Sequence, residues 1–432
     1  MVSARRRAYI VYKEYGVLQL ILSTFSYGLR MTAMAIVHVL DRLCTKSPGL
    51  VLFHNKNGYE GNSRRVFEWI VENQPTDLRP VWVTHDISQY RNLRSLDMNV
   101  VFTYSPRGVY TLARATVLCY DNEHYRWYPD SLEVVRIRHE IPVKGGPYGR
   151  NDTDKGTNDP KQRGTDVTVE KTYDHILFTS EFLAGEHLIR SDVSVVTAGY
   201  PRNDDLLDVP AASERHWCSF TEATDFDFVF LYAPTRRRYK YESEIDLFPF
   251  EDFDSEVLHD RLETWNALLL IRLHPEDEHN THSYPTVHPD GSLSGFIDRL
   301  TASDRIEYVG SDSFEETVDV LPFVDCLLTD YSTIYHTYLL LDRPLVFFPY
   351  DYETAARVEG FKYDYFDHLP GPAIESFEDF LAYSDQLVAG DDPHKEERAD
   401  LRERLYDHTD SIACKRVVEY IRGLAILEGN NP

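Results

Sequence analysis

A chain of 432 residues is longer than one compact core usually supports, so two domains are expected. Hydrophobic residues make up 42% of the sequence, which indicates a globular protein. Acidic residues outnumber basic ones by 71 to 45, and the net charge of −26 repels nucleic acid, which excludes nonspecific DNA or RNA binding. The same acidity is halophile-like, typical of a surface solvated in concentrated salt.

The N-terminal segment from Val17 to Leu40 is mostly apolar and contains Arg30 near its middle. It lacks a small-residue cleavage site in the usual place, which disfavours a signal peptide. In a membrane-spanning helix, Arg30 would cost ~2.5–3.5 kcal/mol. We therefore expect residues 1–47 to form a helix that lies in the membrane interface, with the protein peripheral on the cytoplasmic face. The alternative is a helix packed on the protein's own domain.

From Gly49 the sequence alternates between short apolar runs and helical patterns. The apolar runs predict strands at 50–53, 80–84, 99–103, 116–120, 134–138 and 176–179. Helices are predicted at 63–72, 106–114 and 181–189, and a polar, turn-rich mobile loop at 151–171. This alternation predicts a Rossmann-like acceptor domain over residues 48–205.

The second half repeats this pattern. Strands are predicted at 228–232, 267–273 and 305–309, a surface loop at 246–254, and a last helix at 411–428. We assign residues 206–400 to a Rossmann-like nucleotide-donor domain and residues 401–432 to a C-terminal helix. The predicted fold class is α/β, with two doubly wound domains facing a cleft.

The five cysteines lie far apart and form no CxxC pair. Three of them sit in apolar runs. This usage predicts reduced, buried thiols in a cytoplasmic protein rather than a zinc site or a disulfide framework. The cysteines are Cys44, Cys119, Cys218, Cys326 and Cys414.

The stretch from Val324 to Asp351 predicts a βαβ unit. A strand at 326–328 is followed by three good N-cap residues, a helix at 333–341 and a second strand at 345–348. The capping residues are Asp330, Ser332 and Thr333. Hydroxyl groups at a helix N-terminus suit a phosphate, although an ordinary capped helix has the same pattern.

Four polar clusters each follow a predicted strand. Singly, each has a simple explanation, such as a loop histidine or arginines paired with nearby carboxylates. Strand alternation predicts that Arg272 and His274 lie on the same side of their strand. Together the clusters predict binding of a pyrophosphate and transfer of one of its phosphoryl groups. The clusters are residues 138–146, 233–238, 272–275 and 330–333.

The order of the segments LYAPTRR, LLLIRLHP, LLTDYSTIYHTYLLLDRPLVFFPYD and FDHLPGP resembles the CDP-glycerol glycerophosphotransferases. These are the teichoic-acid primases and polymerases, membrane-associated enzymes of the GT-B type. The resemblance runs from about Leu50 to Ser376, and GYPRND at 199–204 fits it as well. It implies transfer of glycerol phosphate from CDP-glycerol, or a similar CDP-polyol donor, with release of CMP. The implied acceptor is a hydroxyl of a membrane-linked saccharide or polyol-phosphate polymer.

The resemblance also assigns roles to residues. His139 takes the place of the family's catalytic histidine, and His274 is the second catalytic histidine. The family's tryptophan, glycine and threonine around the first histidine are replaced by Arg138, Glu140 and Ile141. The implied donor-binding residues are Lys144, Thr235, Arg237, Arg272, Ser332 and Thr333. Thr337 stands where the family has an aspartate, which leaves open a different donor alcohol.

No metal-binding motif and no cofactor is predicted, so cationic side chains are expected to do the work of Mg²⁺. Two alternatives remain open. One is a GT-B glycosyltransferase that takes a nucleotide sugar. The threonine at position 337, in place of the family's aspartate, is the reason to keep this alternative. The other is a non-catalytic, polymer-binding paralogue, which the altered surroundings of His139 suggest.

Overall fold

The computed structural model describes residues 17, 26–122, 128–129, 131–138, 141, 173–187, 192–236, 247–278, 293–358, 360–361 and 364–427. These residues form two compact units. The first contains described residues from Met1–His139, Gly156–Arg202 and Ile412–Pro432. The second contains described residues from Asn203–Ser411. The loop predicted at 151–171 lies outside the described residues.

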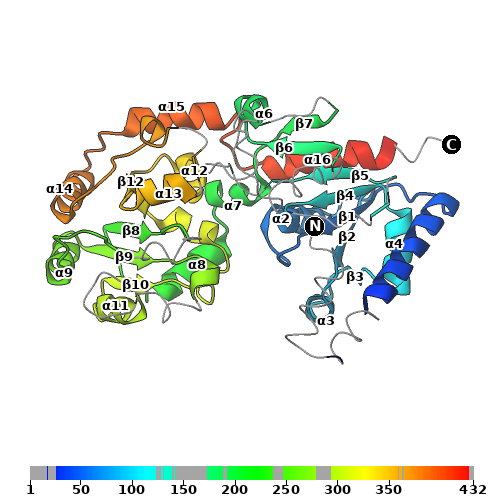
Figure 1. The fold of residues 1–432 in the computed structure, drawn as a ribbon, viewed down its shortest axis with the longest axis horizontal. Helices are drawn as coiled ribbons and strands as arrows, with labels where there is room; N and C mark the ends of the chain where they lie inside the picture. The colour runs from blue at the N-terminus through cyan, green and yellow to red at the C-terminus, as the bar shows by residue number, and fades with distance from the viewer. Residues whose placement is uncertain are drawn as a thin grey trace. The chain divides into compact units, whose positions relative to one another are not determined.

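The first unit is built on a seven-stranded parallel sheet (Figure 1). Its strand order is β3-β2-β1-β4-β5-β6-β7. From β1 the chain adds β2 and β3 on one side. It then returns to the other side of β1, where β4 to β7 follow in order. The strands are β1 Leu50–His54, β2 Arg79–Thr84, β3 Val100–Phe102, β4 Val117–Tyr120, β5 Glu133–Arg136, β6 His175–Phe178 and β7 Ser194–Thr197.

Both faces of this sheet are covered, as its continuous apolar strands require. Val51 and Phe53 of β1 point to a core shared with α2 (Gly61–Asn73) and α16 (Ala413–Leu427). Leu52 points to the opposite core, which includes α4 (Pro106–Arg114). This alternation is the two-residue period of a strand. The other described α-helices of the unit include α3 Ile87–Ser95, α6 Glu181–His187 and the N-terminal helix over residues 26–43.

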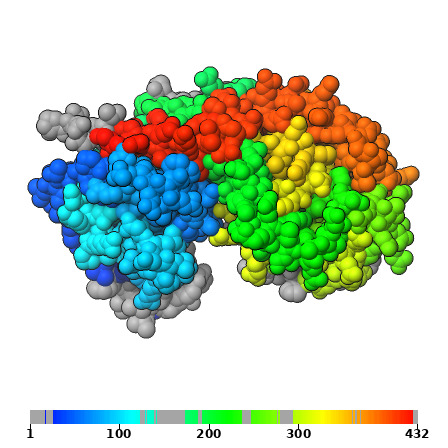
Figure 2. Space-filling view, turned by 180° about the vertical axis from the view of Figure 1, so that it is seen from behind, coloured from blue at the N-terminus to red at the C-terminus, as the bar shows by residue number. Residues whose placement is uncertain are grey.

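The C-terminal helix α16 belongs to the first unit, although the chain before it belongs to the second. Val417, Val418 and Ile421 of α16 are buried against the sheet core. In the space-filling view of Figure 2, the red atoms of this helix lie against the blue atoms of the first unit. The last helix predicted from the sequence is therefore part of the first unit's core.

The second unit has a five-stranded parallel sheet of order β10-β9-β8-β11-β12. Its strands are β8 Phe228–Tyr232, β9 Ala267–Ile271, β10 Ile306–Tyr308, β11 Cys326–Thr329 and β12 Leu345–Phe347. Its longer helices are α8 Ala211–Phe220, α9 Ser255–Thr264, α11 Leu293–Leu300, α14 Phe377–Val388 and α15 Lys395–Leu405. The prediction of an α/β fold with two parallel sheets is confirmed.

The surface loop predicted at 246–254 is a loop over its described part, and Glu251, Asp252 and Asp254 are exposed, but its first residues are not on the surface. Leu247, Phe248 and Phe250 are buried in the core of the second unit. The ring of Phe248 lies 5.1 Å from that of Tyr232, and the ring of Phe250 lies 5.0 Å from that of Phe348. The acidic residues that follow Phe250 are exposed as predicted, whereas the aromatic rings before them pack into the core.

The described part of the N-terminal segment is a helix over residues 26–43. Met34 and Val37 are buried in the core that contains α4, so the helix packs on its own unit. None of the described helices is long and apolar enough to cross a membrane. Packing of this helix on the protein's own domain, the alternative from the sequence, is observed. Several apolar residues of this helix are exposed, among them Leu29, Ile36, Val39 and Leu43.

The cysteines agree with the prediction from the sequence. All five are free thiols, and Cys119, Cys326 and Cys414 are buried. Burial raises the pKa of the Cys119 and Cys326 thiols well above their usual range. These two cysteines lie within strands and act as small apolar residues.

Candidate functional site

In the second unit the polar clusters meet where the strand order reverses, between β8 and β11. Because all five strands are parallel, their carboxyl ends share one edge of the sheet. Thr235 follows β8, Arg272 and His274 follow β9, and Ser332 and Thr333 follow β11. A doubly wound sheet binds its ligands at this switch point. Five of the eight predicted site residues are therefore placed at one sheet edge.

Asp330 joins the two strand ends at this switch point. Its side chain is buried, and its Oδ1 accepts hydrogen bonds from the backbone N–H groups of Thr235 at 2.8 Å and Tyr331 at 2.6 Å. The hydroxyl of Thr329 donates to the carbonyl of Ala233 at 2.7 Å. The loop after β8 is thus fixed to the loop after β11 by two hydrogen bonds, one of them to a carboxylate.

Ser332 and Thr333 stand at the start of α12, which runs from Ile334 to Tyr338 and continues as a short 3₁₀ helix over Leu339–Leu341. Both residues are half-buried. The Ser332 hydroxyl accepts a hydrogen bond from the N–H of Ile334 at 3.4 Å. The α-helical part is shorter than predicted, so its dipole is weaker than the expected nine-residue helix would supply.

Arg272 has a structural environment that the sequence did not reveal. Its side chain is buried, and its guanidinium donates to four backbone carbonyls and to the hydroxyl of Thr317. The carbonyls belong to Val309, Gly310, Phe314 and Glu315. These contacts use all five N–H donors of a guanidinium. In this structure Arg272 holds the loop over residues 309–317, and contact with a donor substrate stays a prediction.

His274 is exposed, whereas Arg272 is buried. The prediction that the two lie on the same side of a strand is wrong, because β9 ends at Ile271 and both residues are beyond it. The adjacent carboxylate of Asp277 is buried and lies 3.6 Å from the guanidinium of Arg236. The ends of β8 and β9 are therefore linked by an ion pair beside His274.

Three predicted site residues, His139, Lys144 and Arg237, lie outside the described residues. The residue before His139 is described. Asn62, which is fully buried at the start of α2, donates to the carbonyl of Arg138 at 2.6 Å. Its side-chain oxygen accepts from the N–H of Arg202 at 2.9 Å. Asn62 thus fixes the chain leading to His139 to the GYPRND turn.

The switch point of the first unit, between β1 and β4, has the same construction as that of the second. Asp121 follows β4 and is fully buried. Its Oδ1 accepts from the N–H of Ser63 at 2.9 Å and from the Ser63 hydroxyl at 2.6 Å, and its Oδ2 accepts from Asn55 at 3.3 Å. A Cβ at Gly61 would lie 2.4 Å from Asp121 Oδ2, so this close approach requires glycine.

A histidine and tyrosine cluster lies at the same edge of the first sheet. His85 follows β2 and hydrogen-bonds with the hydroxyls of Tyr104 at 2.9 Å and Tyr128 at 3.3 Å. The ring of His54, at the end of β1, lies 5.2 Å away. Burial, with the nearby His54 and Arg30, lowers the pKa of His85 from 6.5 to about 3. His85 is therefore neutral at physiological pH.

Sequence reasoning missed the residues of the first switch point and the His85 cluster. An aspartate directly after an apolar strand was the available signal for Asp121, as it was for Asp330. The partners of Asp121 are 58 or 66 positions away in the chain, so spacing alone does not identify them.

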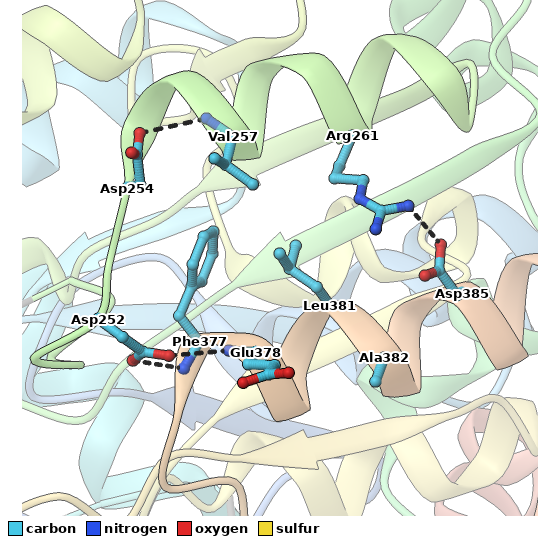
Figure 3. Close-up of a pocket in the computed structure, with 9 residues that line it drawn as sticks. All are labelled: Asp252, Asp254, Val257, Arg261, Phe377, Glu378, Leu381, Ala382 and Asp385. Atoms are coloured by element: carbon cyan, nitrogen blue, oxygen red, sulfur yellow. Dashed lines mark hydrogen bonds and ion pairs between the residues drawn. The ribbon is translucent and has the colours of Figure 1, made fainter.

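A hollow of about 480 Å³ between α9 and α14 is a different kind of site (Figure 3). Its carboxylates cap helices: Asp252 accepts from the N–H groups of Phe377 and Glu378, and Asp254 from that of Val257. Arg261 pairs with Asp385 at 3.3 Å. This acidic lining repels a diphosphate, so the hollow is not a candidate donor site.

Comparison with known proteins identifies the family. The profile of the CDP-glycerol:poly(glycerophosphate) glycerophosphotransferases matches residues 35–423. The chain belongs to this family. The match includes the switch points of both sheets, and it confirms the resemblance stated from the sequence motifs.

Curated relatives are teichoic acid enzymes. The chain is 29% identical over 240 residues to the teichoic acid poly(ribitol-phosphate) polymerase of Bacillus spizizenii, covering 53% of this chain and 33% of the relative. It is 23% identical over 410 residues to the teichoic acid glycerol-phosphate transferase of Staphylococcus aureus, covering 89% and 96%. The chain spans only 33% to 57% of the lengths of this and three other polymerases of the group.

A solved structure of the wall teichoic acid polymerase TagF has the same fold. The TM-score is 0.67 at 16% sequence identity, with 95% of this chain and 98% of that chain covered. At this identity the likeness establishes the fold, and the family assignment depends on the profile match.

Replacement of Asp330 by alanine tests whether the switch point of the second sheet binds the donor. The N–H groups of Thr235 and Tyr331 lose their acceptor, so the free energy of unfolding should fall by ~1–3 kcal/mol and binding of CDP-glycerol should weaken. Asp325→Ala is a matched control, because Asp325 accepts from the N–H of Val229 at the opposite end of β8. It should reduce stability without changing donor affinity in calorimetric titration. Equal loss of affinity in both variants would contradict a switch-point donor site.

The lowered pKa of His85 predicts a pH effect on stability. Between pH 6.5 and about 3 the unfolded chain binds a proton at His85 that the folded chain does not, so this residue destabilises the fold as pH falls. At pH 5 the contribution is about 2 kcal/mol. In His85→Gln, urea unfolding should show about that much less loss of stability between pH 7 and pH 5. An unchanged pH dependence of stability in His85→Gln would contradict the neutral, buried state of His85.

Proposed function

We propose that this chain is a glycerophosphotransferase that moves glycerol phosphate, or a related polyol phosphate, from a CDP-linked donor. The acceptor is a hydroxyl of a membrane-linked saccharide or of a polyol-phosphate polymer. The observation that carries this proposal is the family match over residues 35–423. The polar residues gathered at the switch point of the second sheet support it, because a diphosphate requires donors at the carboxyl ends of such strands.

The chemistry is a phosphoryl transfer. The acceptor oxygen forms a bond to the phosphorus that carries the polyol, the bond from that phosphorus to the bridging oxygen breaks, and CMP leaves. His139 takes the proton of the acceptor hydroxyl as general base. His274 and Arg237 stabilise the negative charge that develops on CMP, with Lys144 near the phosphates. No step in this scheme calls for a metal ion or an organic cofactor.

The contacts of the second unit refine the roles of its residues. Thr235, Ser332 and Thr333 offer hydroxyls at strand ends that Asp330 holds together. Arg272 acts through the loop over residues 309–317, since its guanidinium donors bind that loop. We therefore assign Arg272 a positioning role and keep donor contact for the other residues.

The family match supports the type of reaction, but it leaves more than one candidate for the polyol of the donor. Thr337 occupies the position where the family has an aspartate, and its side chain is buried on α12. The curated relatives include enzymes named for ribitol phosphate as well as for glycerol phosphate. We propose that the donor is CDP-glycerol or CDP-ribitol, with the side chain at position 337 contributing to the choice.

We further propose that the protein works at the cytoplasmic face of the cell membrane, with the helix over residues 26–43 lying in the interface. Met34 and Val37 hold this helix to the sheet. The exposed side chains of Leu29, Val39 and Leu43 offer an apolar surface that is not used in that packing.

A donor screen tests the reaction directly. The purified protein should release CMP from CDP-glycerol or CDP-ribitol in the presence of a lipid-linked or polyol-phosphate acceptor, and should release no UDP from UDP-sugars. His139→Ala should lower turnover at least about 100-fold, as expected for loss of a general base. His216→Ala, an exposed histidine, should retain it. Release of UDP with sugar transfer would favour the glycosyltransferase alternative, and donor binding without any turnover would favour the non-catalytic one.

Exposed positions of the N-terminal helix test the membrane proposal. Leu29→Ser with Val39→Ser removes apolar surface from the exposed side and leaves Met34 and Val37 in place. Flotation with vesicles of phosphatidylglycerol and phosphatidylcholine should show reduced binding of this variant at unchanged thermal stability. Equal flotation of variant and wild type would mean that this helix does not carry membrane attachment.

A further inference from the structure

The first unit has a second polar hollow, at the edge of the sheet opposite to the switch point. It has a volume of about 420 Å³. Its floor includes Leu50, Arg79 and Asn99, which lie at or beside the amino-terminal starts of β1, β2 and β3. One wall is formed by Arg107, Tyr110, Thr111 and Arg114 of α4. His54 lies at the other end of β1, and Asp121 follows the same end of the neighbouring parallel strand β4.

The charge of this hollow is opposite to that of the chain. Three arginines line it and no aspartate or glutamate does, although the sequence has a net charge of −26. Among the described residues, none of Arg79, Arg107 and Arg114 forms an ion pair. By contrast, Arg261, Arg398 and Arg422 each meet an aspartate. Three guanidiniums without counter-charges predict an anionic ligand.

The arginines are held in place by neutral groups. Arg79 donates to the Ser47 hydroxyl at 2.6 Å and to the Pro48 carbonyl at 2.8 Å. Arg114 donates to the Thr45 carbonyl at 3.2 Å and to the Tyr110 hydroxyl at 3.0 Å. Each guanidinium has five N–H donors, so these bonds fix its position and leave further donors for a ligand.

The spacing of the arginines indicates more than one phosphate. Arg107 and Arg114 are seven residues apart on α4, which places them two turns apart on the same face, separated by about 10 Å along the helix axis. In the structure the Arg107 guanidinium is held by Asn99, and that of Arg114 by Thr45 and Tyr110, so the two offer separate positions for phosphate groups. A chain that repeats its phosphates can place one near each of them.

We propose that this hollow binds a phosphodiester segment of the acceptor polymer, away from the end that reacts. The proposal rests on the proposed function for its choice of polymer. Strands of about five residues span about 17–20 Å, so a polymer of several units is needed to engage both sheet edges. Binding at the second site then raises the effective concentration of the polymer end for the reaction. The hollow acts on the affinity for long acceptors and leaves the chemical step unchanged.

Arg107 is the best position for the test, since its side chain is exposed and its contact among the described residues is a 3.3 Å hydrogen bond to Asn99. In Arg107→Glu, the dissociation constant for a poly(glycerol phosphate) chain, measured by calorimetric titration, should rise about tenfold. Arg107→Lys keeps the charge and should stay within about twofold. Arg91→Glu is the matched control: it changes the net charge equally on an exposed position of α3 and should have no effect.

The acceptor-length dependence is the second measurement. In Arg107→Glu, KM should rise for a long acceptor and stay unchanged for an acceptor of one or two units, with kcat unchanged for both. Equal weakening in Arg107→Glu and Arg91→Glu would overturn the site in favour of general repulsion. Weaker binding to phosphatidylglycerol vesicles with unchanged polymer binding would overturn it in favour of a lipid headgroup. The titration needs no turnover, so selective polymer binding without CMP release would uphold the site while refuting the proposed function.

Discussion

A buried carboxylate at each switch point is the interaction on which the site depends. Asp121 and Asp330 each directly follow a central strand, and each accepts the backbone N–H of a segment that follows the neighbouring strand. Both side chains are almost fully inaccessible to water. Hydrogen bonds from backbone N–H groups compensate the cost of burying a carboxylate, and they fix the loops that carry the polar residues. The same solution occurs between β1 and β4 and between β8 and β11.

Around these carboxylates the loops are held by further contacts from distant parts of the chain. Asn62 ties the carbonyl of Arg138 to the turn at Arg202, and Arg272 ties the end of β9 to the loop over residues 309–317. These side chains are buried and make hydrogen bonds with backbone groups. Their role is geometric: they place the neighbouring residues for which we propose contact with the substrate. Such support is required because a misplaced catalytic group loses most of its effect.

The sequence predicted the described strands of both sheets except β7, because a parallel strand covered on both faces is a short continuous apolar run, whereas β7 is an edge strand with exposed residues. The strand predicted at 228–232 matches β8, and the helix predicted at 106–114 matches α4. The environment of Arg272 was not predictable, since its partners lie 37 to 45 positions away and are mostly carbonyls, which every residue has. The burial of Leu247, Phe248 and Phe250 was missed for a related reason: whether aromatic rings next to acidic residues are buried depends on the surface they meet.

Charge, more than volume, distinguishes the polar hollows of this protein. The hollow between α9 and α14 and the one beside α4 are similar in size, at about 480 and 420 Å³. The first is lined by four carboxylates and one arginine, the second by three arginines and no carboxylate. On a chain with a large excess of acidic residues, a carboxylate near an arginine is the common arrangement, and surface pairs of that kind contribute little to stability. An arginine cluster without such partners is therefore the exception among the hollows of this chain, and this difference in charge is the reason for proposing an anionic ligand beside α4.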